Sequence, residues 1–523
     1  MSGLANYNLF RLGRSLHPQA VVFFLFVACY LFLLNTLLLY DRSTYQWDSF
    51  IYMLLAENLY ANGAYSLDGF PHSFHPPGFP FLISLFMYVF RGDVILASKA
   101  LMGLNALLLS VVMYKVACRV LKKRSWAMLA VFLFLLSARN QYGLFWVQPE
   151  NLLAVLYTWL FYLFLLKRKW SASEWCAAPL LTAFACYLKP EPVLFAAVVC
   201  AYFLYRRWSA EWKRLVCFAV VFFLLMAPLI YHNASITGRA SFSGKGGAIV
   251  QWAKMKQMGR DPFFYLADAL ADKTKNEYQY TFGEYHYELS RIGYQPYFPG
   301  VKEIVRRATV DVLEALYKYL GVILTLFFLC SVIFYQYTVK RFCAVFLCYV
   351  LAVCLLYFEN RFIVPWLPLL YIYAVRQLIK VSFFCAKKNH FQPGTVFYLF
   401  VSFAIISSAP FLHFMSSAHH VHPCFALANH IESENKIILS NHPSFAVTME
   451  QNKTYLVPHH LNLADLNTIQ SAHKINYIII NHWRGSKDKW ISASVEELKA
   501  LFQQVDVMPF GKSKTLLITV GGH

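Results

Sequence analysis

Charged residues are scarce in this chain. They make up 14% of its 523 residues, whereas a soluble domain carries about 25%. Hydrophobic residues make up 58% and come in long blocks. A block of about 18 or more apolar residues is typical of a transmembrane helix. The shortage of charge therefore excludes an ordinary soluble domain and indicates an α-helical polytopic membrane protein.

Paired cysteine motifs are also lacking. No C-x-x-C or metal-type spacing occurs, and most of the twelve cysteines lie inside apolar blocks, where they behave as small hydrophobic residues. We therefore expect neither a disulfide framework nor a zinc knuckle. A short apolar region followed by an A-x-A cleavage site is missing as well, so we expect the first apolar block to be a retained span rather than a signal peptide.

Acidic residues are few beside basic ones, and the formal net charge is +20. The basic residues cluster at alternate ends of the apolar blocks, as the positive-inside rule predicts for cytoplasmic loops. Nucleic-acid binding is the weaker explanation, and we expect no nucleic-acid partner. The clusters are Arg11 and Arg14; Arg119 and Lys122 to Arg124; Lys167 to Lys169; Arg206, Arg207, Lys213 and Arg214; Lys340 and Arg341; and Arg376, Lys380, Lys387 and Lys388.

Eleven segments are predicted to span the membrane. An odd number places the N-terminus in the cytoplasm and the C-terminal part outside, and every basic cluster then falls on the cytoplasmic side. The fifth and sixth segments are short, and could instead form a hairpin that crosses only partly. The segments lie near 18–40, 94–118, 125–139, 148–166, 173–188, 191–205, 215–232, 317–336, 342–358, 362–380 and 395–414.

Three segments are predicted to lie outside the membrane. Residues 41–93 and 233–312 form outer loops of a membrane domain, 1–417, and within the first loop 81–90 is too short to span and suits an interfacial helix. Residues 418–523 alternate β-rich runs with one helical run, which indicates a small extracytoplasmic α/β domain.

The first outer loop contains the residues that attract most interest. Asp48, Tyr52, Glu57 and Tyr60 are spaced so that they share roughly one side of a helix, just past the first span. His75-Pro76-Pro77-Gly78 then makes a rigid turn back toward the membrane. An ordinary amphipathic surface helix with solvated acids would explain the same spacing.

Four further ionisable residues are expected at the same outer level. Glu150 opens the fourth span, Lys189 lies in the turn LKPEP, and Glu359 and Arg361 lie between the ninth and tenth spans. Ionisable groups at membrane depth are costly and indicate a functional site. A local salt bridge between Glu359 and Arg361, and snorkelling of Lys189, are the structural alternatives.

In their order along the chain, these motifs resemble those of the GT-C membrane glycosyltransferases, in particular the protein O-mannosyltransferases and lipid A aminoarabinose transferases. The resemblance covers about 360 residues. It departs at Ser49, where many members have glutamate, and at His232, where arginine is frequent. The matching residues are Asp48, Tyr52 and HPPGFP; Glu150; Lys189-Pro190; Pro228, Asn233 and Gly238; and Glu359, Arg361, Phe362 and Pro365.

The resemblance implies a sugar donor on a polyprenyl phosphate and an acceptor hydroxyl on a protein, lipid or glycan. Asp48 is the expected general base, and Arg361 and Lys189 are the expected cations for the departing phosphate. No cofactor is assigned, and a divalent metal stays open. The expected location is a bacterial inner membrane, with a transporter or flippase of a lipid-linked substrate as the alternative function. The other expected substrate-binding residues are Tyr52, Glu57, His75, Glu150, Asn233 and Glu359.

Overall fold

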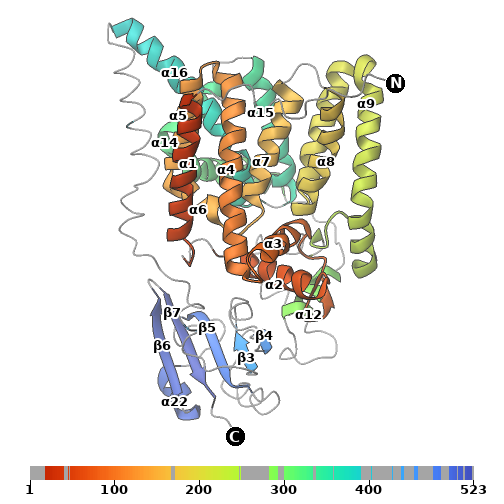
Figure 1. The fold of residues 1–523 in the computed structure, drawn as a ribbon, viewed down its shortest axis with the longest axis vertical. Coiled ribbons are helices and arrows are strands. Elements are labelled where there is room, and N and C mark those ends of the chain that lie inside the picture. Colours follow the sequence, from red (N-terminus) through yellow and green to blue (C-terminus); the bar gives the residue numbers. More distant parts are fainter. Residues whose placement is uncertain are drawn as a thin grey trace.

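The computed structural model is mainly helical, with a small sheet near its C-terminal end (Figure 1). It describes residues 18–40, 45, 47–166, 171–246, 248, 282–291, 300–333, 337–356, 358–389, 402, 427, 437–440, 453–456, 475–483, 494–502, 504–510 and 513–520.

The described helices account for most of the predicted spans. They are α1 (Pro18–Leu37), α2 (Trp47–Asn62), α3 (Gly78–Val89), α4 (Val94–Leu121), α5 (Arg124–Leu136), α6 (Ala138–Phe145), α7 (Glu150–Phe161) with its π-helical extension η3 (Tyr162–Leu166), α8 (Ala172–Leu188), α9 (Pro192–Thr237), α12 (Phe282–Arg291), α13 (Val301–Arg306), the π-helical η5 (Arg307–Asp311), α14 (Val312–Ile333), α15 (Tyr337–Leu356), the 3₁₀ element η6 (Asn360–Trp366) and α16 (Leu367–Asn389).

Four of the described helical segments are long and apolar enough to cross a membrane: Gln19–Leu37, Val94–Leu121, Leu215–Thr237 and Asn360–Phe384. Shorter apolar helices cover other predicted spans, and the helix predicted over 81–90 corresponds to α3, which begins at Gly78 and ends at Val89. The separate spans predicted at 191–205 and 215–232 both fall in α9, because no residue between them breaks the helix. The span predicted at 395–414 lies outside the described residues except for position 402.

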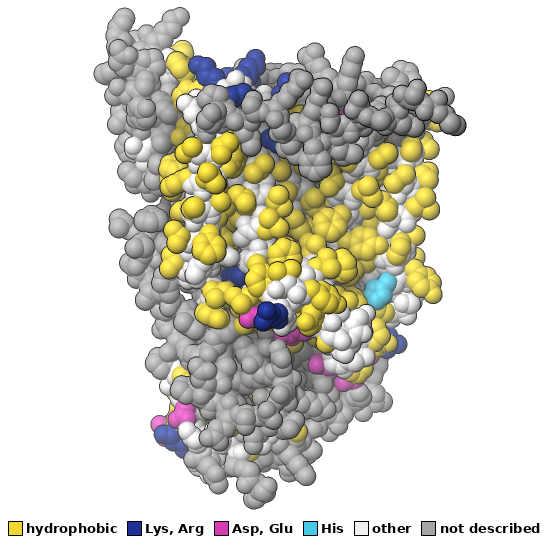
Figure 2. Space-filling view, in the orientation of Figure 1, with side chains coloured by type: hydrophobic (Ala, Val, Ile, Leu, Met, Phe, Trp, Pro, Cys, Tyr) yellow, Lys and Arg dark blue, Asp and Glu magenta, His cyan; other side chains and the backbone are white. Residues whose placement is uncertain are grey.

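The helices carry a belt of hydrophobic side chains (Figure 2). Lys and Arg side chains gather along the upper edge of the belt, at the end away from the β-strands. This arrangement is the charge bias that the sequence predicts. Which side of a membrane that end faces remains a prediction.

The C-terminal strands form one mixed sheet in the order β4-β3-β5-β7-β6. β3 (Ile437–Ser440) is parallel to β4 (Lys453–Leu456) and β5 (Tyr477–Trp483), while β7 (Ser513–Thr519) is antiparallel to β5 and to β6 (Gln504–Phe510). A single described helix, α22 (Val495–Leu501), precedes β6 and begins with a capping box. The predicted small α/β domain is confirmed for the described residues.

A compact loop connects α2 to α3. β1 (Ser66–Leu67) and β2 (Phe70–Pro71) form a hairpin whose two-residue turn is Asp68-Gly69, and both turn residues have positive φ. Asp-Gly is a favoured pair for such a turn. Pro77 then precedes the first residue of α3, where a proline costs no helical hydrogen bond. Figure 1 shows α2, α3 and α12 at the end of the bundle that lies nearest the β-strands.

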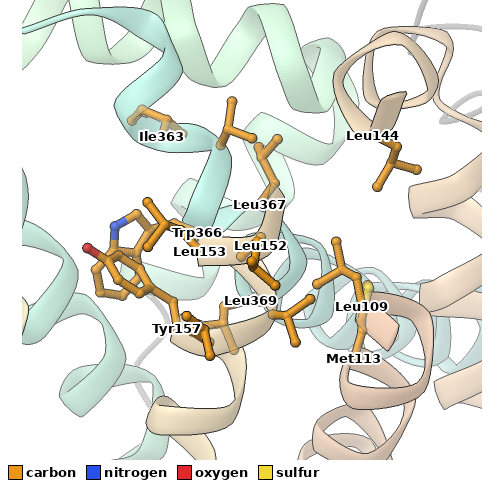
Figure 3. Close-up of a cluster of buried hydrophobic side chains, with 14 of the residues drawn as sticks. Leu109, Met113, Leu144, Leu152, Leu153, Tyr157, Ile363, Trp366, Leu367 and Leu369 are labelled. Atoms are coloured by element: carbon orange, nitrogen blue, oxygen red, sulfur yellow. The ribbon is translucent and has the colours of Figure 1, made fainter. Parts of the chain in front are cut away.

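The core beneath this loop is formed by α4, α7, η6 and α16 (Figure 3). Trp366 is fully buried, and its ring packs against Tyr157 with their centroids 5.3 Å apart. Leu152, Leu153 and Leu367 fill the space beside them. Because a close-packed core resists displacement, α7 and η6 hold the residues at their first turns in fixed positions.

Candidate active site

Residues from distant parts of the chain meet at one end of the helical bundle. Asp48 lies in the first turn of α2 and Glu150 in the first turn of α7, where the helix dipole favours an acid. Lys189 follows the last residue of α8. Glu359 precedes η6, and Arg361 lies in its first turn. The end of one element or the start of another therefore positions each charged side chain.

A continuous chain of ion pairs connects these groups. Arg361 Nη1 is 2.9 Å from Asp48 Oδ2, and Arg361 Nε is 2.5 Å from Glu359 Oε2 and 3.9 Å from Glu150 Oε1. Glu150 Oε1 in turn accepts a hydrogen bond of 2.6 Å from Lys189 Nζ. The local pair of Glu359 and Arg361, expected as a structural alternative, is present, but it is one part of this larger network.

The network is deep at one end and accessible at the other. The Glu150 side chain is only 2% exposed, whereas those of Asp48 and Arg361 are 23% and 25% exposed. Lys189 is also 3.9 Å from Glu191 Oε1, so it lies between two acids. A ligand approaching from solvent would therefore meet Asp48, Arg361 and Glu359 before Glu150.

His75 lies near the carboxylate oxygen of Asp48 that Arg361 Nη1 does not contact. Its Nε2 is 3.6 Å from Asp48 Oδ1, and its ring packs edge-on against Tyr52 with centroids 5.0 Å apart. Tyr65 fixes the turn by donating a hydrogen bond of 2.6 Å to the carbonyl oxygen of His75. His72 stacks on His75, with an angle of 6° between the two rings.

A further cation, Lys245, enters from the turn that follows α9. Its Nζ lies 4.8 Å from the centroid of the Phe74 ring. The turn approaches the His72–His75 segment so closely that a Cβ atom at Gly244 would be 2.4 Å from the carbonyl oxygen of Ser73. Only glycine fits there. Lys245 was not among the predicted site residues, because spacing along the sequence gives no sign of the contact with Ser73.

Two hydrogen bonds from the end of α9 hold the two turns, one to the turn that carries Lys245 and one to the His72–His75 segment. Asn233 donates to the carbonyl oxygen of Ser241 over 3.0 Å, and His232 Nε2 is 2.8 Å from the carbonyl oxygen of His72. Asn233 is thereby placed as a support for the Lys245 turn; its predicted contact with substrate stays a prediction. His232 contacts backbone at the position where arginine is frequent among the proteins that the chain resembles.

Burial and charge set the protonation states of Asp48 and of His75 and Lys245 next to it. Burial alone would raise the pKa of Asp48, but the charges of Lys245 and Arg361 favour the carboxylate and hold its pKa well below the usual range. Burial and the charge of Lys245 lower the pKa of His75 to about 3. Burial lowers the pKa of Lys245 to about 8. At neutral pH the site therefore holds a carboxylate, a neutral imidazole and an ammonium group.

The structure brings most of the predicted residues together. Asp48, His75, Glu150, Glu359 and Arg361 lie in or beside the ion-pair network, as does Lys189. Glu57 lies apart, because it is nine positions after Asp48, which corresponds to roughly 13 Å along a helix. Its role in substrate binding is untested.

The network has no evident place for a metal ion. Within the part of the chain that the structure describes, no group of three or more His, Cys, Asp and Glu side chains is arranged to hold one. Asp48 and Glu150 each direct a carboxylate oxygen at a cation instead. The divalent metal that the sequence left open therefore has no ligand set among these residues.

Residues 74–232 match the family model described as dolichyl-phosphate-mannose-protein mannosyltransferase. The matched segment includes His75, Glu150 and Lys189, three of the predicted site residues. The match confirms, over these residues, the resemblance to GT-C membrane glycosyltransferases. The chain is thus similar to the membrane glycosyltransferases of the GT-C type. No curated protein matches the chain.

Two solved structures illustrate what the chain is similar to in three dimensions. One is ArnT from Cupriavidus metallidurans bound to undecaprenyl phosphate, with a TM-score of 0.45, 11% identity, and coverage of 96% of this chain and 99% of that one. The other is the oligosaccharyltransferase AglB from Archaeoglobus fulgidus in complex with an inhibitory peptide and a dolichol-phosphate, with a TM-score of 0.48, 13% identity, and coverage of 89% and 70%. Scores this low carry no argument about function.

Proposed function

We propose that this protein transfers a sugar from a polyprenyl-phosphate donor to an acceptor hydroxyl, with Asp48 as the general base. The observation that carries the proposal is the 2.9 Å contact of Asp48 with Arg361, 313 residues away. It joins a partly exposed carboxylate to a partly exposed guanidinium at one end of a membrane-type bundle. The family match supports the donor class, because its description contains a dolichyl-phosphate-linked sugar.

The proposed reaction needs a base and a cationic site for the leaving group. Asp48 takes the proton of the acceptor hydroxyl as C1 of the sugar gains oxocarbenium character, much as the base of an inverting glycosidase acts on water. The bond between C1 and the phosphate oxygen breaks, and its electron pair leaves with the polyprenyl phosphate. Preorganised cations stabilise that charge in a site with little water.

Arg361 and Lys245 are the cations best placed for the phosphate. Arg361 offers a planar, bidentate group at the accessible end of the network. The glycine turn holds Lys245 against the His72–His75 segment, where its charge favours the Asp48 carboxylate. Lys189, which the sequence suggested for this role, is paired with Glu150 at 2.6 Å and adjoins Glu191. Its charge is already balanced, so we assign it to holding Glu150 instead.

The remaining network residues shape the sugar and acceptor sites in this proposal. Glu150 has one carboxylate oxygen buried without a hydrogen-bond partner among the described residues. Such an oxygen suits a substrate hydroxyl, because leaving it unsatisfied is costly. Tyr52 and Glu359 border the same space from α2 and η6. The proposal leaves the sugar and the acceptor, whether protein, lipid or glycan, open, and places the reaction at the outer face of a bacterial inner membrane.

The decisive variant is Asp48→Asn, which keeps the shape of the side chain and removes its basicity. We expect transfer to fall by about 10²–10⁴-fold, the usual contribution of a general base. The assay is transfer of radiolabelled mannose from polyprenyl-phosphate mannose to a crude envelope fraction by the purified full-length protein.

Asp93→Asn is the matched control. Asp93 caps α4 by accepting a hydrogen bond from the backbone of Leu96, and asparagine caps helices equally well. This variant should transfer at the wild-type rate. If Asp48→Asn did so too, with an unchanged melting temperature, Asp48 would not be the base.

A further inference from the structure

The hydrogen bonds around His72 fix the tautomer of His75. The backbone N–H of His75 donates to His72 Nε2 over 3.0 Å, so that nitrogen presents a lone pair. His75 Nδ1 is 3.1 Å from the same nitrogen. Two lone pairs would repel at this distance, and the contact is favourable only when His75 carries its proton on Nδ1. The neutral His75 ring therefore presents an unprotonated Nε2.

That Nε2 points at the proposed base. It is buried, has no hydrogen-bond partner within the described residues, and lies 3.6 Å from Asp48 Oδ1. Since 3.6 Å is too long for a hydrogen bond, the carboxylate oxygen and the imidazole nitrogen are two acceptors facing each other. The other carboxylate oxygen is already bound by Arg361. Asp48 Oδ1 and His75 Nε2 would form a hydrogen bond if one proton lay between them, and the proposed reaction delivers a proton to Asp48.

We propose that His75 takes over from Asp48 the proton of the acceptor hydroxyl. This inference rests on the proposed function. The acceptor O–H bond breaks, its proton passes to Asp48 Oδ1, and the acceptor oxygen forms its bond to C1 as the phosphate leaves. The proton then moves to His75 Nε2. The product is an imidazolium that donates from Nδ1 to His72 and from Nε2 to the restored Asp48 carboxylate, and the proton is later released to water.

The groups around His75 explain why it is unprotonated at rest and why it can accept a proton during the reaction. Asp48 and Tyr52 face it from α2, His72 and Tyr65 from the loop, and His286 from α12. Burial and the positive charge of Lys245 lower its pKa to about 3, against the opposing effect of Asp48. A donor phosphate bound at Lys245 would offset that charge. Donor binding should therefore raise the proton affinity of His75 when it is needed.

The tautomer can be tested without an assay of activity. In full-length protein with ¹⁵N-labelled histidine in nanodiscs, solid-state NMR distinguishes a protonated from an unprotonated ring nitrogen. The His75 signals are identified by their loss in His75→Gln. We expect protonated Nδ1 and unprotonated Nε2 at pH 7. Protonated Nε2 in the resting protein would overturn the proposal, whatever the fate of the proposed function.

The kinetic test compares His75→Gln with His286→Gln. His286 packs on His75 with ring centroids 5.6 Å apart, but the proposed proton path does not include it. With polyprenyl-phosphate mannose as the donor, we expect kcat of His75→Gln to fall by about 10²-fold with little change in KM. The acidic limb of the kcat profile should move to lower pH, because Asp48 alone then titrates. His286→Gln should keep the wild-type limb.

The outcomes separate the two proposals. An inactive Asp48→Asn with a His75→Gln of wild-type kcat would overturn the role of His75 and leave the glycosyltransferase proposal standing. A fall in kcat of His75→Gln with an unmoved acidic limb would assign His75 a packing role only. An active Asp48→Asn would overturn the proposed base, and the proton path with it.

Discussion

The turn that carries Lys245 offers a sharp test of how the site is assembled. Changing Gly244 to alanine would place the new Cβ 2.4 Å from the carbonyl oxygen and 2.5 Å from the hydroxyl oxygen of Ser73. Real contacts of this kind are about 1 Å longer, because carbon and oxygen repel at shorter range. Either the Lys245 turn or the His75 turn must therefore move by that distance.

The expected cost follows from this displacement. Overpacking of this kind destabilises a protein by about 1–3 kcal/mol. A shift of about 1 Å in a positioning group can lower a reaction rate by about 10²-fold. Because both turns border Asp48, we expect kcat/KM of Gly244→Ala to fall by about 10²-fold while the protein still folds.

The assay is transfer from polyprenyl-phosphate mannose, with the melting temperature in detergent measured in parallel. Gly246→Ala is the matched control, because a Cβ atom at Gly246 has nothing within 4 Å and no positive φ stands against it. This second variant should keep its activity. Equal activity of the two variants would refute the close approach of the two turns and, with it, the placement of Lys245 in the site.

Two other variants test individual charges. Because the pKa of Lys245 is about 8, its charge is present below that pH and lost above it, so KM for the donor should rise by about tenfold at pH 9. In Lys245→Arg the KM for the donor should not change with pH over this range. A wild-type KM that does not change between pH 7 and pH 9 would exclude Lys245 from donor binding. Lys189→Met leaves the buried Glu150 without its 2.6 Å partner and should cost about 3–5 kcal/mol in chemical unfolding. Adding Glu150→Gln should restore most of the lost stability, and a double variant as unstable as Lys189→Met would contradict the pairing of Lys189 with Glu150.

Much of the fold could be predicted from hydrophobic run length and charge alone. The long apolar segments of α1, α4 and α16 are each explained by the cost of exposing polar backbone to lipid, which only a continuous helix avoids. The cost of placing a charge in lipid also identified the ionisable residues within apolar sequence as candidates for a functional site. Glu150 and Arg361 interrupt apolar sequence, and each is found in the ion-pair network.

Lys245 and His72 were not predicted as site residues, and the reason is the same for both. Lys245 and His72 lie in polar loops, where a charge or an imidazole costs nothing locally, so neither stands out. Their importance comes from contacts between distant segments: the approach of Gly244 to Ser73, and the hydrogen bond from His232 to the carbonyl oxygen of His72. Such contacts are set by the packing of helices and not by local periodicity.

The pairing of Asp48 with Arg361 also bears on the order of the reaction. In the resting site the guanidinium stabilises the carboxylate and weakens it as a base. A donor phosphate that takes over the Arg361 hydrogen bonds would release Asp48 and strengthen it. Donor binding should therefore precede productive acceptor binding, and initial rates measured with both substrates varied should show an ordered mechanism with the donor first. Acceptor binding of equal affinity with and without polyprenyl-phosphate mannose would show that Arg361 does not couple the two substrates.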